Sequence, residues 1–135
     1  MALRYAFLLL LVYLLWYHNF MGNPEYRSLW EERKVERERK RELAIEKAKS
    51  VAKILKEKYH AKEVILFGSL IWRPDFFWTG TDIDLMVKGL KGEEYFEILA
   101  DVSTLAHPIH VDLIPFEKAE VSIRKRALKE GVRLE

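Results

Sequence analysis

Three aspartates have the residue type and spacing for metal chemistry. Asp82 and Asp84 lie in the segment Thr81-Asp82-Ile83-Asp84-Leu85-Met86-Val87, and Asp112 lies in Val111-Asp112-Leu113. Polar and apolar residues alternate in both segments, which predicts strands that bury one face and expose the carboxylates on the other. Like charges about 4 Å apart repel by about 4 kcal/mol at an effective dielectric of about 20. A divalent cation removes that cost, and if the strands are neighbours the carboxylates can hold two Mg²⁺ ions, as in phosphoryl transfer.

A tight turn precedes the acidic segment. The apolar run Val64-Ile65-Leu66-Phe67 predicts a buried strand, and the run ends at Gly68-Ser69. Glycine lets a backbone turn sharply and approach a ligand closely. The ordered set of strand, Gly-Ser turn, aspartate pair and third aspartate is more specific than any of its parts.

In these residues the sequence resembles the minimal nucleotidyltransferases, small members of the polymerase-β-like nucleotidyltransferase superfamily. The resemblance extends from Lys56 to the C-terminus, and its matching segments are Leu66-Phe67-Gly68-Ser69, Thr81-Asp82-Ile83-Asp84-Leu85 and Val111-Asp112-Leu113. It implies an α/β (α+β) fold with a small mixed β-sheet. Helices are expected to pack on one face of this sheet, and the metal site is expected on the other.

The resemblance also implies a reaction and a role for each site residue. An acceptor hydroxyl attacks the α-phosphorus of a nucleoside triphosphate, expected to be ATP, and pyrophosphate leaves. Asp82 and Asp84 hold Mg²⁺, and Asp112 completes the metal site and helps to deprotonate the acceptor. Gly68 and Ser69 open a short helix and hold the phosphates, in accord with the affinity of helix N-termini for anions.

One stretch departs from the pattern of the family. Trp72 occupies the position where an arginine is usual, and Arg73 follows one residue later; we predict that Arg73 binds the nucleotide. The stretch is long and aromatic, with Trp72, Phe76, Phe77 and Trp78. These rings could form a lid over the base, a surface for a protein partner or a cover for the core.

The acceptor is expected from outside the chain, because the sequence contains no second domain that could recognise it. A protein partner or a second copy of the chain, as a homodimer, would supply it. Minimal nucleotidyltransferases often pair with a HEPN-domain protein as antitoxin to toxin, so the resemblance implies adenylylation of a tyrosine on such a partner. The alternative is a non-catalytic module that binds nucleotide or a partner through the aromatic stretch and the charged helix.

Composition restricts the other classes of function. The 135 residues suggest one domain. A net charge of +2, from 23 Lys and Arg against 21 Asp and Glu, gives no general signal for nucleic-acid binding. The absence of cysteine excludes disulfides, zinc–thiolate sites and a thiol nucleophile. An enzyme that uses a nucleoside triphosphate is expected in the cytoplasm.

Residues 1–21 form an apolar N-terminal segment with three interpretations. Its apolar run, Tyr5 to Tyr17, is shorter than the roughly 20 residues that a spanning helix needs. In the first interpretation, translation starts at Met21 instead of Met1. In the second, residues 2–21 form a helix that contacts a partner or a membrane. The third is a signal peptide, although no Ala-x-Ala-like cleavage site follows.

The remaining chain is divided by composition. Residues 22–42 predict a charged helical arm that begins with the capping box Ser28-Leu29-Trp30-Glu31. Residues 43–135 predict the nucleotidyltransferase domain, and an apolar stripe continues the long helix into it. His110 shares the Asp112 face of its strand. Its simplest interpretation is a surface residue, and an auxiliary role in the site is the alternative.

Overall fold

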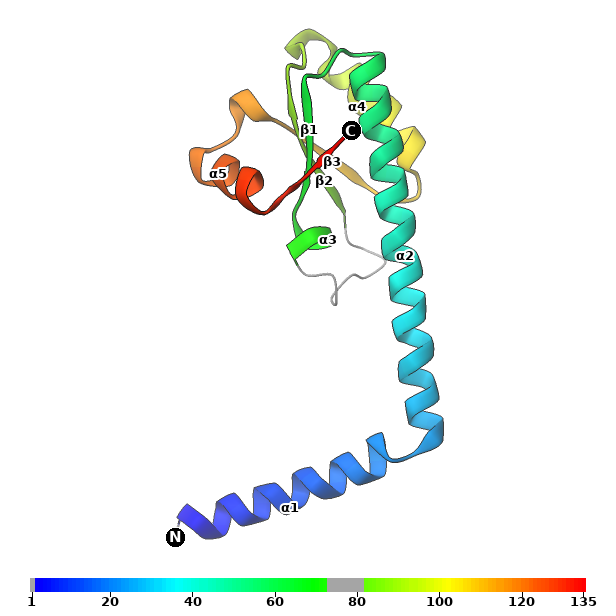
Figure 1. Ribbon diagram of the computed structural model, residues 1–135, viewed down its shortest axis with the longest axis vertical. Helices are drawn as coiled ribbons and strands as arrows, with labels where there is room; N and C mark the ends of the chain where they lie inside the picture. Colours follow the sequence, from blue (N-terminus) through cyan, green and yellow to red (C-terminus); the bar gives the residue numbers. More distant parts are fainter. Residues whose placement is uncertain (1, 73–81) are drawn as a thin grey trace. The chain divides into compact units, whose positions relative to one another are not determined.

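The computed structural model describes residues 2–72 and 82–135 (Figure 1). By its internal contacts the chain divides into two units, Met1–Glu38 and Arg39–Glu135. The boundaries expected from composition, 1–21, 22–42 and 43–135, stay predictions.

Two helices precede the sheet, α1 at Ala2–Met21 and α2 at Pro24–Glu57. The second helix begins four residues before Ser28, so the predicted capping box does not open it. Instead, the side-chain oxygen of Asn23 accepts a hydrogen bond of 3.1 Å from the Glu25 backbone N–H. Pro24 occupies the first turn, where its missing N–H leaves no hydrogen bond unmade.

A four-stranded mixed sheet forms the centre of the second unit (Figure 1). Its strand order is β3-β2-β1-β4, and β1 is antiparallel to both β2 and β4 whereas β2 and β3 are parallel. A parallel pair needs a crossover connection, and α4 (Tyr95–Ala106) lies between β2 and β3 in the chain. The strands are β1 Glu63–Phe67, β2 Ile83–Lys88, β3 Val111–Pro115 and β4 Val132–Leu134.

One face of the sheet packs against α2, which carries the apolar stripe expected from the sequence, and against α4. Every second residue of the central strands points into this core, as the alternation predicts. The buried strand residues include Val64, Leu66, Ile83, Leu85, Val87, Val111 and Leu113. The helices contribute Ala44, Ala48, Val51, Ala52, Leu55, Ile98, Val102 and Ala106.

The opposite face is partly covered by α5 (Val121–Glu130), which Figure 1 shows on the other side of the sheet from α2 and α4. Ala127 of this helix packs with Ile65, Phe67 and Met86 in a second, smaller core. The expected α/β class with a small mixed sheet is confirmed. The expectation that the helices lie on one face holds for α2 and α4, and α5 differs because the second face also has apolar residues to bury.

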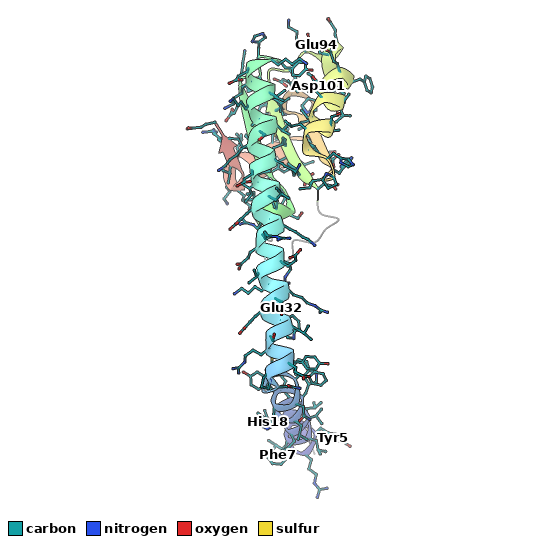
Figure 2. The ribbon with its side chains drawn as sticks, turned by 90° about the vertical axis from the view of Figure 1, so that its right-hand side faces the viewer. Tyr5, Phe7, His18, Glu32, Glu94 and Asp101 are labelled. Carbon is teal, nitrogen blue, oxygen red and sulfur yellow. The ribbon has the colours of Figure 1, made fainter. Side chains whose placement is uncertain are left out.

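A polar contact ties the C-terminal end of α2 to α4. Lys58 Nζ lies 2.6 Å from Asp101 Oδ2, and the hydroxyl of Tyr59 donates to the same oxygen. Figure 2 labels Asp101 on α4. The hydrogen bonds from Lys58 and then Tyr59 lower the pKa of Asp101, so the carboxylate is the form that holds this contact.

Candidate metal and nucleotide site

The register of the sheet brings Asp84 and Asp112 side by side. Asp84 on β2 is the direct partner of Asp112 on β3 and of Phe67 on β1. Residues paired across neighbouring strands point to the same face. The three side chains therefore form a row on the face that α5 partly covers, and the expectation that the two acidic strands are neighbours is met.

Asp82 is the residue directly before β2, and its side chain lies beside this row. A carboxylate oxygen of Asp82, a ring nitrogen of His110 and a carboxylate oxygen of Asp112 all lie within 4.8 Å of one another. The backbone helps to fix this arrangement, because the Ile83 N–H donates a hydrogen bond of 2.9 Å to the carbonyl of His110. The group is solvent-accessible: the side chains of Asp82, His110 and Asp112 are 42%, 66% and 53% exposed.

His110 has a larger place in the site than the sequence indicated. Its Nδ1 lies 3.4 Å from Asp82 Oδ2 and 3.9 Å from Asp112 Oδ1. Alternation along the strand placed His110 on the Asp112 face. Its contact with Asp82 follows from the parallel pairing of β2 and β3, which alternation within one strand cannot reveal.

Asp84 is the innermost carboxylate and the one under the greatest electrostatic strain. Its partial burial, then the negative charge of Asp112, then that of Asp82 raise its pKa from the usual 3.8 to about 6, against an opposing effect of His110. Above that pH the cluster carries repelling charges. Carboxylate oxygens are the ligands that Mg²⁺ prefers, so this donor set fits a divalent cation that would neutralise the repulsion.

Gly68 brings the turn after β1 against the carboxylate of Asp84. Its φ is +82°, and a Cβ at this position would lie 2.1 Å from Asp84 Oδ2. Both the backbone conformation and the lack of space therefore require glycine here. The carbonyl of Gly68 accepts hydrogen bonds from the N–H groups of Ile71 and Trp72, at 3.1 and 2.9 Å.

The short helix α3 (Ser69–Trp72) begins directly after this glycine, as the sequence predicts. The first N–H groups of a helix have no acceptor within the helix. In α3 the N–H groups of Ile71 and Trp72 donate to Gly68, so those of Ser69 and Leu70 are the ones that could face an anion. Ser69 is half-exposed at this end and adds a hydroxyl donor. Donors for an anion and acceptors for a cation thus lie next to each other.

An aromatic–guanidinium stack borders the same face. The Trp72 ring packs on Phe67 with centroids 5.8 Å apart, and the guanidinium carbon of Arg126 lies 3.7 Å from the Trp72 ring centroid. Such a distance is typical of a cation–π contact. Arg126 belongs to α5, more than fifty residues from Trp72, and no local sequence signal identifies the pair. Arg73, Phe76, Phe77 and Trp78 lie outside the described residues, so the structure does not test the roles predicted for them.

The glycine turn after the first strand and the carboxylates on the two following strands define a domain of the nucleotidyltransferase class. The model of the family described as "Polymerase beta, Nucleotidyltransferase" matches residues 49–134, and the chain belongs to this family. A comparison with curated proteins finds no match. The roles of the individual site residues and the minimal nucleotidyltransferase subgroup stay predictions.

Proposed function

We propose that this protein is a Mg²⁺-dependent nucleotidyltransferase that transfers AMP from ATP to a hydroxyl acceptor. The observation that carries the proposal is the pairing of Asp84 with Asp112 across β2 and β3, with the Gly68 turn in contact with Asp84. A site for a cation and a site for a phosphate are both needed when a nucleoside triphosphate binds as its Mg²⁺ complex.

In the proposed reaction the acceptor oxygen forms a bond to the α-phosphorus, and the bond from that phosphorus to the bridging oxygen of the β-phosphate breaks. Pyrophosphate takes the electrons of the broken bond. Asp112 accepts the proton of the acceptor hydroxyl, a role that suits an exposed carboxylate beside the reacting atoms. The backbone at Gly68 and Ser69 orients the β- and γ-phosphates, with Arg73 as a further ligand.

Asp82, Asp84 and Asp112 are the residues proposed to hold two Mg²⁺ ions. When bound, such ions neutralise charge that develops on the attacking and leaving oxygens. The protein contributes by holding three carboxylates together on two paired strands before the nucleotide arrives, so little reorganisation is needed at the moment of reaction.

We further propose that the acceptor is a tyrosine hydroxyl on a HEPN-type protein partner, which would make the protein an adenylylating antitoxin. The exposure of Asp82, His110 and Asp112 supports an acceptor on another macromolecule, because a side chain of a second protein can reach an open cluster. A homodimer in which one copy serves as acceptor is the competing source of the hydroxyl, and the experiment below separates the two.

The test is incubation of the purified protein with Mg²⁺ and ATP labelled at the α-phosphate, alone and with candidate partner proteins. The proposal expects label to enter protein with release of one pyrophosphate per transfer, and Asp84→Asn to abolish both. Label on a partner tyrosine supports the antitoxin role, and label on the chain itself supports the homodimer. Nucleotide binding without pyrophosphate release under all conditions would contradict catalysis and favour a non-catalytic binding module.

A further inference from the structure

The helix α1 exposes a large apolar surface that the nucleotidyltransferase fold does not explain. Its large apolar side chains are exposed along its whole length, for example Leu9 at 70% and Leu15 at 61%. Figure 2 shows the side chains of Tyr5, Phe7 and His18 on this helix. Water is an unfavourable environment for so much contiguous apolar surface, which in general marks a site of interaction.

The length of α1 matches the hydrocarbon thickness of a bilayer. Its 20 residues span about 30 Å at a rise of about 1.5 Å per residue, and the apolar core of a bilayer is about 30 Å thick. Among the described residues, one helical segment, Leu3–Met21, is long and apolar enough to cross a membrane by length and composition. The helix is longer than the run from Tyr5 to Tyr17 because His18 and Asn19 do not interrupt it.

The apolar residues of α1 surround the helix axis. Phe7 through Val12 are six consecutive apolar residues, which cover more than a full turn of about 3.6 residues. A helix that lies flat in the membrane interface has one strongly polar face, and this stretch has none. An apolar surface on all sides suits a lipid environment better than a single protein groove.

Aromatic side chains gather at the C-terminal end of α1 and continue past the break. Trp16 stacks on Phe20 with ring centroids 5.5 Å apart, and Phe20 meets Tyr26 edge-on at 4.9 Å. Tyr13 and Tyr17 join the same group. Tryptophan and tyrosine are enriched where a spanning helix leaves the hydrocarbon and enters the headgroup region.

The charges on the two sides of α1 are unequal in the way that sets membrane orientation. One basic residue, Arg4, precedes the apolar run. After the helix come seven such residues within twenty positions: Arg27, Arg33, Lys34, Arg37, Arg39, Lys40 and Arg41. Orientation depends on the lysine and arginine count in short flanking segments rather than on net charge, and the richer side stays in the cytoplasm.

We propose that α1 is a transmembrane anchor that holds the nucleotidyltransferase domain at the cytoplasmic face of a membrane. The partner surface is the lipid bilayer itself. The proposal does not depend on catalysis, and it is compatible with the family assignment because ATP is available on the cytoplasmic side. A later start at Met21 and a cleaved signal are the competing interpretations, and the mass measurement below separates them from the anchor.

Fractionation of cells that express the full chain gives the first test. The protein should pellet with membranes, resist extraction by alkaline carbonate and be released by detergent. The substitutions Leu10→Lys and Leu11→Lys together should move at least ten times more of it into the soluble fraction. Leu29→Lys with Leu43→Lys is the matched control, because these leucines have similar exposure, 50% and 48% against 53% and 42%, but lie outside the span.

The membrane topology of the chain gives the second test. Because the sequence contains no cysteine, an introduced cysteine is the sole site for a maleimide. One cysteine is introduced as Ala2→Cys or as Ser50→Cys, and a membrane-impermeant maleimide is added to sealed cells or to inverted vesicles. The proposal expects label at position 2, directly before the span, from outside and at position 50 from the inverted side only. Label at both positions from the same side, or release of the chain by alkaline carbonate, would overturn the spanning arrangement.

The mass of the protein purified from its native membranes completes the test. A mass that includes residues 2–20 supports the anchor. A mass that begins at Met21, or at a cleavage site after α1, would overturn it. A soluble, uncleaved full-length chain would overturn it as well, whereas loss of transferase activity in any of these preparations would bear only on the proposed function.

Discussion

Asp84 is the residue in which the fold and the proposed chemistry conflict most directly. It lies half-buried between Phe67 and Asp112, where burial and two neighbouring carboxylates raise its pKa to about 6. The folded state therefore holds a proton more tightly than the unfolded state between pH 3.8 and about 6. The contribution of Asp84 to stability is present below pH 3.8 and is lost as the pH rises through 6.

Asp84→Asn should consequently abolish transfer and stabilise the metal-free protein at pH 8. We expect a gain of about 1 kcal/mol in the free energy of unfolding, reduced from the full linkage value because the side chain is partly solvated. The gain should disappear near pH 4, where Asp84 is largely protonated. Chemical denaturation at both pH values with a chelator present measures it, and a less stable variant at pH 8 would show that the carboxylate is held by contacts that the account omits.

Gly68 should tolerate no side chain. In Gly68→Ala the new Cβ would displace the Asp84 carboxylate, and the positive φ would add strain of about 1 kcal/mol or more. Transfer should fall at least 100-fold. Gly92→Ala is the matched control, because a Cβ there meets no atom within 4 Å. Steady-state rates and thermal unfolding of the two variants compare them, and equal activity would remove Gly68 from the site.

His110 should influence which metal the cluster prefers. Its Nδ1 lies 3.4 Å from Asp82 Oδ2, and an imidazole beside carboxylates favours Mn²⁺ or Co²⁺ relative to Mg²⁺. His110→Ala should weaken Mn²⁺ binding about 10-fold and leave Mg²⁺ binding nearly unchanged. His107→Ala serves as control, since His107 is exposed and lies outside the group of Asp82, His110 and Asp112. Equal losses for both metals would assign His110 a structural role.

At the scale of elements, local patterns predicted the strands but not every packing partner. Alternation identified the residues of β2 and β3 that face the core, and the apolar stripe of α2 was readable in the same way. The sequence did not indicate which side of the sheet α5 covers. Among the apolar residues of this helix only Ala127 is buried, while Val121, Ile123 and Leu128 are exposed. The contact of Arg126 with Trp72 depends on that placement.

Arg126 should contribute to nucleotide binding through its contact with Trp72. Because α5 sets its guanidinium against Trp72 at the end of α3, Arg126→Ala should weaken ATP binding about 10-fold with little change in kcat. Lys125→Ala removes the same charge from the neighbouring exposed position and should leave affinity unchanged. Fluorescence titration with ATP measures both variants. Equal affinities would show that the stack serves only to pack α5 on the sheet.

The whole molecule joins a nucleotidyltransferase domain to a charged helix and an apolar helix. The family model matches residues 49–134. Within this range, strand pairing makes neighbours of residues that are distant in the sequence. The alternation of polar and apolar residues identified the acidic residues of the site. Their convergence depends on β2 lying between β1 and β3, which is a property of the complete sheet.

Calorimetric titration of Mn²⁺ into the metal-free protein tests this convergence most directly. If β2 and β3 share one metal site, Asp112→Asn and Asp84→Asn should each lower Mn²⁺ affinity at least 10-fold, although the two residues belong to different strands, and Asp101→Asn should have no effect. Unchanged Mn²⁺ affinity in both Asp112→Asn and Asp84→Asn would contradict a metal site shared by β2 and β3.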